Sequence, residues 1–209
     1  MSFRMLLICI YVFLSGSVAI AATTPKHKIL IVGDSISAGY GVPTNNGWVS
    51  LLSEALNTQA EIINASISGE TTAGGRARID KLLAQHQPTI VVIELGGNDG
   101  LRGFPLDRIN NNLSHMIEQS QQNQACGIVL LGMRIPPNYG PRYSEGFYRM
   151  YSALADAYHT ELVPFFLEDI ATQSELMQPD GIHPGAEAQS MLLDNALPAI
   201  EKAMSGCAH

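Results

Sequence analysis

The sequence contains few charged residues, and they form no basic run. Of its 209 residues only 15% are charged, and the formal net charge at neutral pH is -7. Such a chain has no electrostatic reason to bind nucleic acid or anionic lipid headgroups. Linkers, low-complexity segments and internal repeats are also missing, which at this length predicts one domain. We therefore expect a small-molecule partner and no nucleic acid.

Several motifs that would carry other chemistry are absent as well. Neither Gly-x-Gly-x-x-Gly nor a Gly-Lys-Ser/Thr loop follows the first predicted strand, which excludes two common nucleotide sites. The Gly-x-Ser-x-Gly elbow of the α/β-hydrolases is missing too. Asp180 and His183 lie close in sequence, but no further ligand cluster accompanies them to form a zinc site. We expect neither a metal nor another cofactor.

One apolar run stands out, and it lies at the N-terminus. Arg4 precedes the apolar stretch Met5–Val18, and Ala19-Ile20-Ala21 then has the small-x-small pattern of a signal-peptidase site. The stretch is short for a membrane span, which needs about 20 apolar residues. We interpret residues 1–21 as a signal peptide, with an uncleaved anchor as the alternative. The mature chain is then secreted or periplasmic, without a stable membrane anchor.

Cysteine is scarce, with three residues in the whole chain. Cys9 lies inside the apolar run, so only Cys126 and Cys207 would remain after cleavage. Export makes a disulfide between them chemically possible. Sequence alone does not fix their distance, and two free thiols are the slightly favoured interpretation.

Apolar, β-branched runs alternate with longer helical patterns along the chain. Alternation of this kind predicts βαβ units, parallel pairing and an α/β fold with three layers. Five strands favour a five-stranded parallel sheet of flavodoxin-like order. The predicted strands are Lys28–Val32, Glu61–Asn64, Thr89–Leu95, Gly127–Leu131 and Glu161–Pro164. The predicted helices lie near Gly47–Asn57, Ala73–Gln85, Leu106–Gln122, Ser144–His159 and Ala186–Met204.

Polar residues follow the carboxyl ends of several predicted strands, where sites form in such sheets. Ser35 comes directly after the first strand, and a late loop carries Asp180 and His183. A serine hydroxyl needs an adjacent base, and a histidine serves when a carboxylate orients its ring. The residues predict Ser35 as nucleophile, His183 as base and Asp180 as its partner. We also expect Pro184 at the first position of the last helix.

Acyl transfer needs donors for the negative oxygen of its tetrahedral intermediate. The backbone N–H groups of Ser35 and Gly69 and the side-chain amide of Asn98 are the candidates for this oxyanion hole. The neighbouring carboxylates Asp34 and Asp99 are expected to hold loops in place and not to react.

These blocks resemble the SGNH (GDSL-type) hydrolases. The resemblance is carried by Gly33–Ile36, Gly69, Gly97–Asp99 and Asp180–Pro184, with Ile36 in place of the usual leucine. Residues 94–104 and 133–140 are similar to the periplasmic group of acyl-CoA thioesterases, lysophospholipases and arylesterases. The resemblance implies a single SGNH hydrolase domain over residues 22–209, and it implies the site roles given above.

The same resemblance implies a broad-specificity serine hydrolase that acts on aryl esters, acyl-CoA thioesters and lysophospholipids. Two alternatives stay open, a carbohydrate O-acetylesterase and a non-catalytic protein that binds acyl chains. In the family the loop at residues 100–104 covers the acyl chain, and we expect a monomer or weak oligomer. The expected substrate contacts are Leu101, Phe104, Arg134, Ile135 and Pro136.

Overall fold

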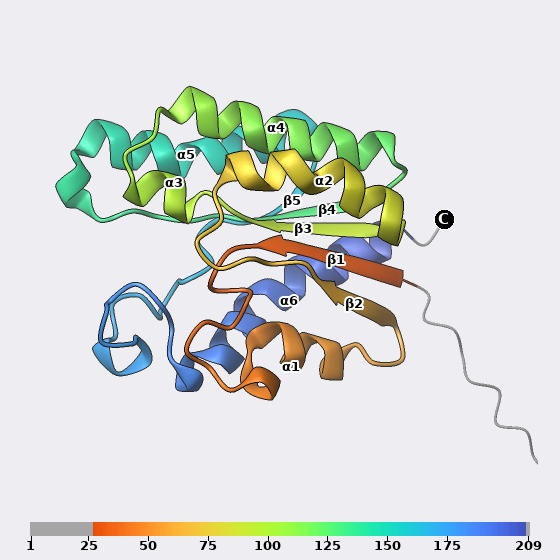
Figure 1. Ribbon diagram of the computed structural model, residues 1–209, viewed down its shortest axis with the longest axis horizontal. Helices are drawn as coiled ribbons and strands as arrows, with labels where there is room; N and C mark the ends of the chain where they lie inside the picture. Colours follow the sequence, from red (N-terminus) through yellow and green to blue (C-terminus); the bar gives the residue numbers. More distant parts are fainter. Residues whose placement is uncertain (1–26, 208–209) are drawn as a thin grey trace, which may run out of the picture.

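Five parallel strands form the central sheet of the computed structural model, which describes residues 27–207. Their order is β2-β1-β3-β4-β5, which confirms the predicted flavodoxin-like arrangement (Figure 1). Because all pairs are parallel, the carboxyl ends of the strands lie along one edge. The strands are β1 (His27–Gly33), β2 (Ala60–Asn64), β3 (Ile90–Glu94), β4 (Gly127–Leu131) and β5 (Glu161–Val163).

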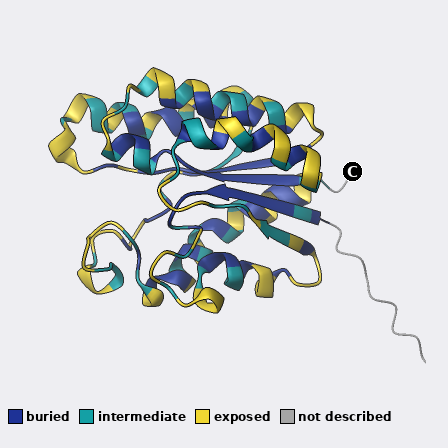
Figure 2. Cartoon of the chain, in the orientation of Figure 1, coloured by how far each residue is buried: buried dark blue, intermediate teal, exposed yellow. Residues whose placement is uncertain are grey.

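The sheet is buried on both faces, as its apolar runs predict. Every residue of β3 and of β4 is buried, whereas β2 and β5 at the edges are partly exposed. Figure 2 shows the buried strands between helices whose outer faces are exposed. Parallel strands need this cover because their connections cross over both faces.

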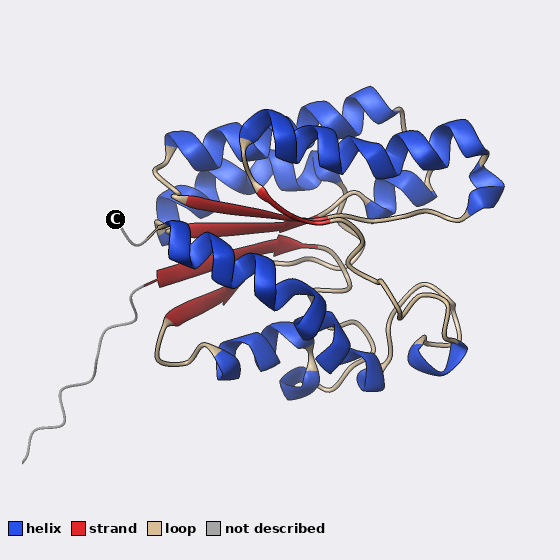
Figure 3. Cartoon of the chain, turned by 180° about the vertical axis from the view of Figure 1, so that it is seen from behind, coloured by secondary structure: helices blue, strands red, loops and turns tan. Residues whose placement is uncertain are grey.

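Two helical layers provide the cover. Helices α1 and α6 lie on one face, and α2, α3, α4 and α5 lie on the other (Figures 1 and 3). Ile109, Leu113, Met116 and Ile117 recur at helical spacing in α4, and the face that they form is buried. The helices are α1 (Trp48–Ala55), α2 (Thr72–His86), α3 (Gly97–Leu101), α4 (Leu106–Gln122), α5 (Pro141–Tyr158) and α6 (Gln189–Gly206). Short 3-10 turns are η1 (Thr44–Asn46), η2 (Pro137–Tyr139), η3 (Ser174–Leu176) and η4 (Ala186–Ala188).

Two helix starts differ from the sequence prediction. Pro184 does not begin the last helix, because it forms a bridge with Met177, and η4 begins only after Gly185. The start of α5 lies at Pro141, three residues before the predicted Ser144. Proline suits the first turn of a helix, where no N–H donor is needed.

The two cysteines of the described residues form a disulfide, which corrects the slight preference for free thiols. Cys126 precedes β4 and Cys207 follows α6, and their Cα atoms are 5.4 Å apart. The return of α6 along the sheet brings together two residues that are 81 positions apart. The predicted signal peptide, residues 1–21, lies outside the described residues.

Candidate active site

The loop after β1 is held against the end of β3. Strand pairing places Gly33 opposite Glu94, whose Oε2 accepts hydrogen bonds from Asp34 N (3.1 Å), Ser37 N (3.3 Å) and Ser37 Oγ (2.7 Å). A Cβ on Gly33 would lie 2.7 Å from that same oxygen. Only glycine therefore permits this close approach. The turn that carries Ser35 is thus fixed from beneath by a buried carboxyl group.

Glu94 and Asp34 form a buried acidic pair with unequal surroundings. Burial raises the pKa of Glu94 well above its usual value, and the nearby charge of Asp34 raises it further. Burial raises the pKa of Asp34 too, but hydrogen bonds from Ile36 N and the Asn98 amide oppose that rise. These donors favour ionised Asp34. We assign the proton of the pair to Glu94.

Ser35, His183 and Asp180 form a continuous hydrogen-bonded chain. Ser35 Oγ lies 2.9 Å from His183 Nε2, and His183 Nδ1 lies 2.7 Å from Asp180 Oδ2. The other carboxylate oxygen of Asp180 accepts the N–H groups of Ile182 (2.9 Å) and His183 (3.0 Å). These bonds, with the one to the His183 ring, lower the pKa of Asp180 to about 2. An ionised Asp180 fixes the ring so that Nε2 can accept the Ser35 proton.

Asn98 lies in α3 with its side-chain amide oriented from two directions. Its Nδ2 donates to Asp34 Oδ2 (3.1 Å), and its Oδ1 accepts from Arg102 at 3.5 Å. The same arginine donates to the carbonyl of Gly69 at 3.3 Å. Gly69 is exposed with a φ of 78°, a conformation that favours glycine. Arg102 thereby links two of the three residues predicted to stabilise the oxyanion.

Asp99 fixes α3 to the neighbouring helix. Its carboxylate accepts the backbone N–H of Thr72 at 2.8 Å and the Thr72 hydroxyl at 2.6 Å, at the start of α2. Asp99 thus fixes α3 to α2, and Asp34 supports the loop of Ser35 in the same way. Both carboxylates have the supporting place that the sequence predicts for them.

The predicted substrate contacts are only partly accessible. Leu101, the last residue of α3, and Phe104 are partly buried, whereas Ile135 is 6% exposed and packs against Gly100. Pro136 is exposed. Arg134, also exposed, stacks on the rings of Tyr148 (4.0 Å) and Phe165 (5.3 Å).

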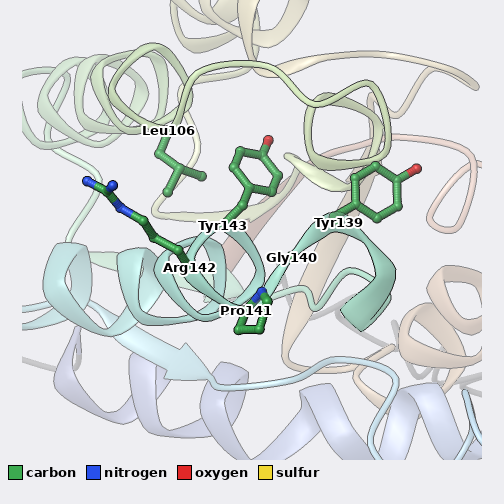
Figure 4. A pocket seen from close by; sticks show the side chains of 6 residues that line it. All are labelled: Leu106, Tyr139, Gly140, Pro141, Arg142 and Tyr143. Carbon is green, nitrogen blue, oxygen red and sulfur yellow. The ribbon is translucent and has the colours of Figure 1, made fainter.

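A hollow of about 370 Å³ adjoins the segment at residues 101–104. Figure 4 shows the ring of Tyr143 beside Leu106 among its lining side chains. The hydroxyl of Tyr143 donates to the carbonyl of Phe104 at 2.6 Å, and that of Tyr139 donates to the carbonyl of Leu101 at 2.8 Å. Two phenols thus attach the segment to η2 and α5. The lining does not include Ser35 or His183.

Three supporting residues of the site, Glu94, Tyr40 and Gln178, were not predicted from the sequence. Glu94 is an acid at the end of an otherwise apolar strand, and that position was a usable signal. The sequence held no such signal for Tyr40 or Gln178, because their contacts depend on loops that the fold brings together. The ring centroid of Tyr40 lies 4.6 Å from that of His183.

Two features are absent from residues 27–207. This part of the chain has no cluster of three or more His, Cys, Asp or Glu side chains that could hold a metal ion. Nor does any of its helices have the length and hydropathy needed to cross a membrane.

Comparison with known proteins gives consistent matches. Residues 31–190 match the model of the GDSL-like lipase/acylhydrolase family. The chain is 48% identical to an arylesterase of Vibrio mimicus over 83% of this chain and 88% of that protein. It is 42% identical to thioesterase 1/protease 1/lysophospholipase L1 of Escherichia coli K12 over 79% of each. The crystal structure of TesA has a TM-score of 0.82 at 49% identity, covering 84% of this chain and 99% of that one.

Proposed function

The chain belongs to the GDSL-like lipase/acylhydrolase family, and from that premise we propose that it hydrolyses carboxylic esters and thioesters through an acyl intermediate on Ser35. The names of its relatives, arylesterase and thioesterase/lysophospholipase, support broad specificity for small ester substrates. One observation carries the mechanism: Ser35 Oγ lies 2.9 Å from His183 Nε2, whose ring is held by Asp180.

In the first half-reaction, Ser35 Oγ attacks the acyl carbonyl while His183 Nε2 takes the hydroxyl proton. Asp180 stays ionised and stabilises the imidazolium. The C–O or C–S bond then breaks, and the leaving alcohol or thiol receives the proton from His183. A water molecule repeats the sequence on the acyl-serine, so that the acid is released and Ser35 regains its proton.

The negative oxygen of both tetrahedral intermediates needs fixed donors. We assign this role to the N–H groups of Ser35 and Gly69 and to the amide of Asn98. The hydrogen bonds of Asn98 to Asp34 and Arg102 support this assignment, because they orient the amide before substrate arrives. Preorganised donors of this kind often make the largest contribution to acyl transfer.

We further propose that Leu101 and Phe104 contact the acyl chain, with Arg134, Ile135 and Pro136 bordering the same side. We propose that the enzyme is secreted or periplasmic, which the signal-peptide pattern of residues 1–21 supports. We also propose that residues 22–209 form a single catalytic domain. It acts as a monomer or weak oligomer, without a stable membrane anchor.

Replacing the nucleophile tests the mechanism directly. Ser35→Ala should lower the kcat for p-nitrophenyl butyrate by at least about 10⁴-fold and abolish labelling by a fluorophosphonate probe. Ser50→Ala is the matched control, since the Ser50 hydroxyl only donates to Thr44 O on the surface. A folded Ser35→Ala protein that keeps its turnover would refute the proposal, and an inactive wild type would favour the acyl-binding alternative.

Chain length separates the main proposal from the O-acetylesterase alternative. Phe104→Ala should lower kcat/KM for the octanoyl ester by about tenfold and leave the acetyl ester nearly unchanged, because only the longer chain reaches the lost ring. Wild-type kcat/KM should also be higher for octanoyl than for acetyl p-nitrophenyl esters. A preference for acetyl esters would instead support a carbohydrate O-acetylesterase.

A further inference from the structure

Two loops distant in sequence carry the nucleophile and its base, and one side chain connects them. We propose that Gln178 is a positioning residue that sets the distance between Ser35 and His183 by joining these loops. The inference rests on the proposed function, because it concerns the geometry of the same reaction.

The side-chain amide of Gln178 spans the two loops. Its Nε2 donates to the carbonyl of Tyr40 at 2.7 Å and to the carbonyl of Pro184 at 3.0 Å. Tyr40 is in turn bonded to the nucleophile, since its N–H donates to the carbonyl of Ser35 at 3.0 Å. Pro184 directly follows His183. A single amide group thus connects the residue beside the base with the turn of the nucleophile.

The loop that carries the base, residues 177–184 (the base loop), is held from within by the backbone of Gln178. Its N–H donates to the carbonyl of His183 at 2.7 Å, and its own carbonyl accepts the N–H of Gly181 at 2.9 Å. The bridge between Met177 and Pro184 closes the same loop. Asp180 and His183 are therefore held as one unit with Gln178, and the amide fixes where that unit sits.

The loop that carries the nucleophile, residues 34–41 (the nucleophile loop), leaves space for this amide at Gly41. Gly41 has a φ of 71°, and a Cβ there would lie 2.2 Å from Gln178 Oε1. A side chain at position 41 would therefore push the amide away. The ring of Tyr40 lies against that of His183 at 4.6 Å, which adds a second contact between the loops.

This geometry bears on rate because proton transfer depends on the 2.9 Å separation of Ser35 Oγ and His183 Nε2. A displacement of about 1 Å between reacting groups can lower a rate by about 10²-fold. Without the amide, the base loop keeps its backbone hydrogen bonds and loses its fixed place over Ser35. The chemical step should suffer, while the acyl-binding side chains stay in place.

The test is Gln178→Met, which keeps the length of the side chain and removes both N–H donors. For p-nitrophenyl acetate we expect kcat to fall about 10- to 100-fold and KM to change less than about threefold. Labelling of Ser35 by a fluorophosphonate should slow by a similar factor. The matched control is Gln173→Met, since the Gln173 amide donates only to the carbonyl of Asp169, and it should keep wild-type kcat.

Three outcomes of the Gln178→Met experiment would overturn the proposal: a folded Gln178→Met with kcat within about twofold of wild type, an equal loss in Gln173→Met, or a loss confined to KM. Should Gln178→Met fail to fold, Gly41→Ala displaces the amide without removing it, and the same fall in kcat and labelling is required. A Gly41→Ala protein with wild-type kcat would also overturn it. Failure of the proposed function is recognised separately, by turnover that persists in Ser35→Ala.

Discussion

At the scale of single residues, Asn98 shows how one side chain is prepared for its task before substrate binds. Its amide is fixed by Asp34 and Arg102, so the loss of the side chain removes a donor that is already oriented. We expect Asn98→Ala to lower kcat by about 10²–10³-fold with little change in KM. Steady-state kinetics with a p-nitrophenyl ester measures this.

Asn123→Ala is the control for that experiment, because Asn123 is exposed at the end of α4 and its side chain donates only to Gln119 O. It should keep wild-type kcat. A loss of less than about threefold in a folded Asn98→Ala protein would remove Asn98 from the oxyanion hole.

The raised pKa of Glu94 makes folding stability depend on pH. The folded state keeps this carboxyl protonated at pH values where the unfolded chain, with a pKa near 4.5, has lost the proton. The contribution of Glu94 to stability is therefore fully present below about pH 4.5 and is lost as pH rises toward the folded pKa, by up to about 1.4 kcal/mol per pH unit. Glu94→Gln cannot ionise and should lack this slope.

Urea unfolding at several pH values between about 5 and 8 compares the two proteins. Relative to wild type, Glu94→Gln should gain unfolding free energy as pH rises. Glu54→Gln, exposed on α1, should follow the wild-type slope. Parallel curves for wild type and Glu94→Gln would show that Glu94 is ionised in the folded protein.

The pKa of Asp180 is shifted downward, opposite to that of Glu94. Its pKa of about 2 lies below the usual 3.8, so this group stays ionised at every pH where activity is ordinarily assayed. General-base catalysis requires a neutral imidazole, so activity should fall on the acid side, where Asp180 is still ionised. A pH profile of kcat/KM measures the fall, and a flat profile from about pH 5 to 9 would contradict the role of His183.

At the scale of elements, the short helix α3 depends on one glycine. Gly96 precedes α3 with a φ of 118°, and a Cβ there would lie 2.3 Å from the hydroxyl of Tyr151. We expect Gly96→Ala to lower the free energy of unfolding by about 2–4 kcal/mol, through backbone strain and this clash. Because Asn98 lies two residues later, kcat should fall as well.

Gly103→Ala separates the two causes. Gly103 also has a positive φ, 66°, but its Cβ would meet nothing within 4 Å. Its replacement should therefore cost only the backbone strain, about 1–2 kcal/mol. Urea unfolding of both variants measures the difference, and equal costs would mean that the Tyr151 contact is easily relieved.

The elements that the sequence predicted well are those with a strong pattern. The buried strands and the apolar face of α4 follow from continuous or periodic apolar residues, and the rule for parallel sheets then placed Ser35, Asn98 and His183 at one edge. Helix α3 was missed because Gly97–Leu101 is five residues long with two glycines, too short to show a period. Gln178 was missed because its partners lie in another loop.

At the scale of the whole molecule, the sheet separates the candidate site from the disulfide. The site lies at the carboxyl ends of the strands, whereas Cys126 precedes the amino end of β4 (Figure 1). Sequence could not decide this bond, because the distance between the two cysteines depends on how α6 packs. The separation predicts that the bond affects stability and not turnover.

The double variant Cys126→Ser/Cys207→Ser tests that separation. Removing a link between residues 81 positions apart frees the unfolded chain, so the free energy of unfolding should fall by about 2–4 kcal/mol. At 25 °C kcat should stay within about twofold of wild type, since Ser35, His183 and Gln178 keep their contacts at the other end of the sheet. Urea unfolding and steady-state kinetics on the same preparations measure both quantities. A tenfold fall in the kcat of a fully folded double variant would mean that the sheet transmits strain from one end to the other, and the position of His183 would then depend on more than the two loops that Gln178 joins.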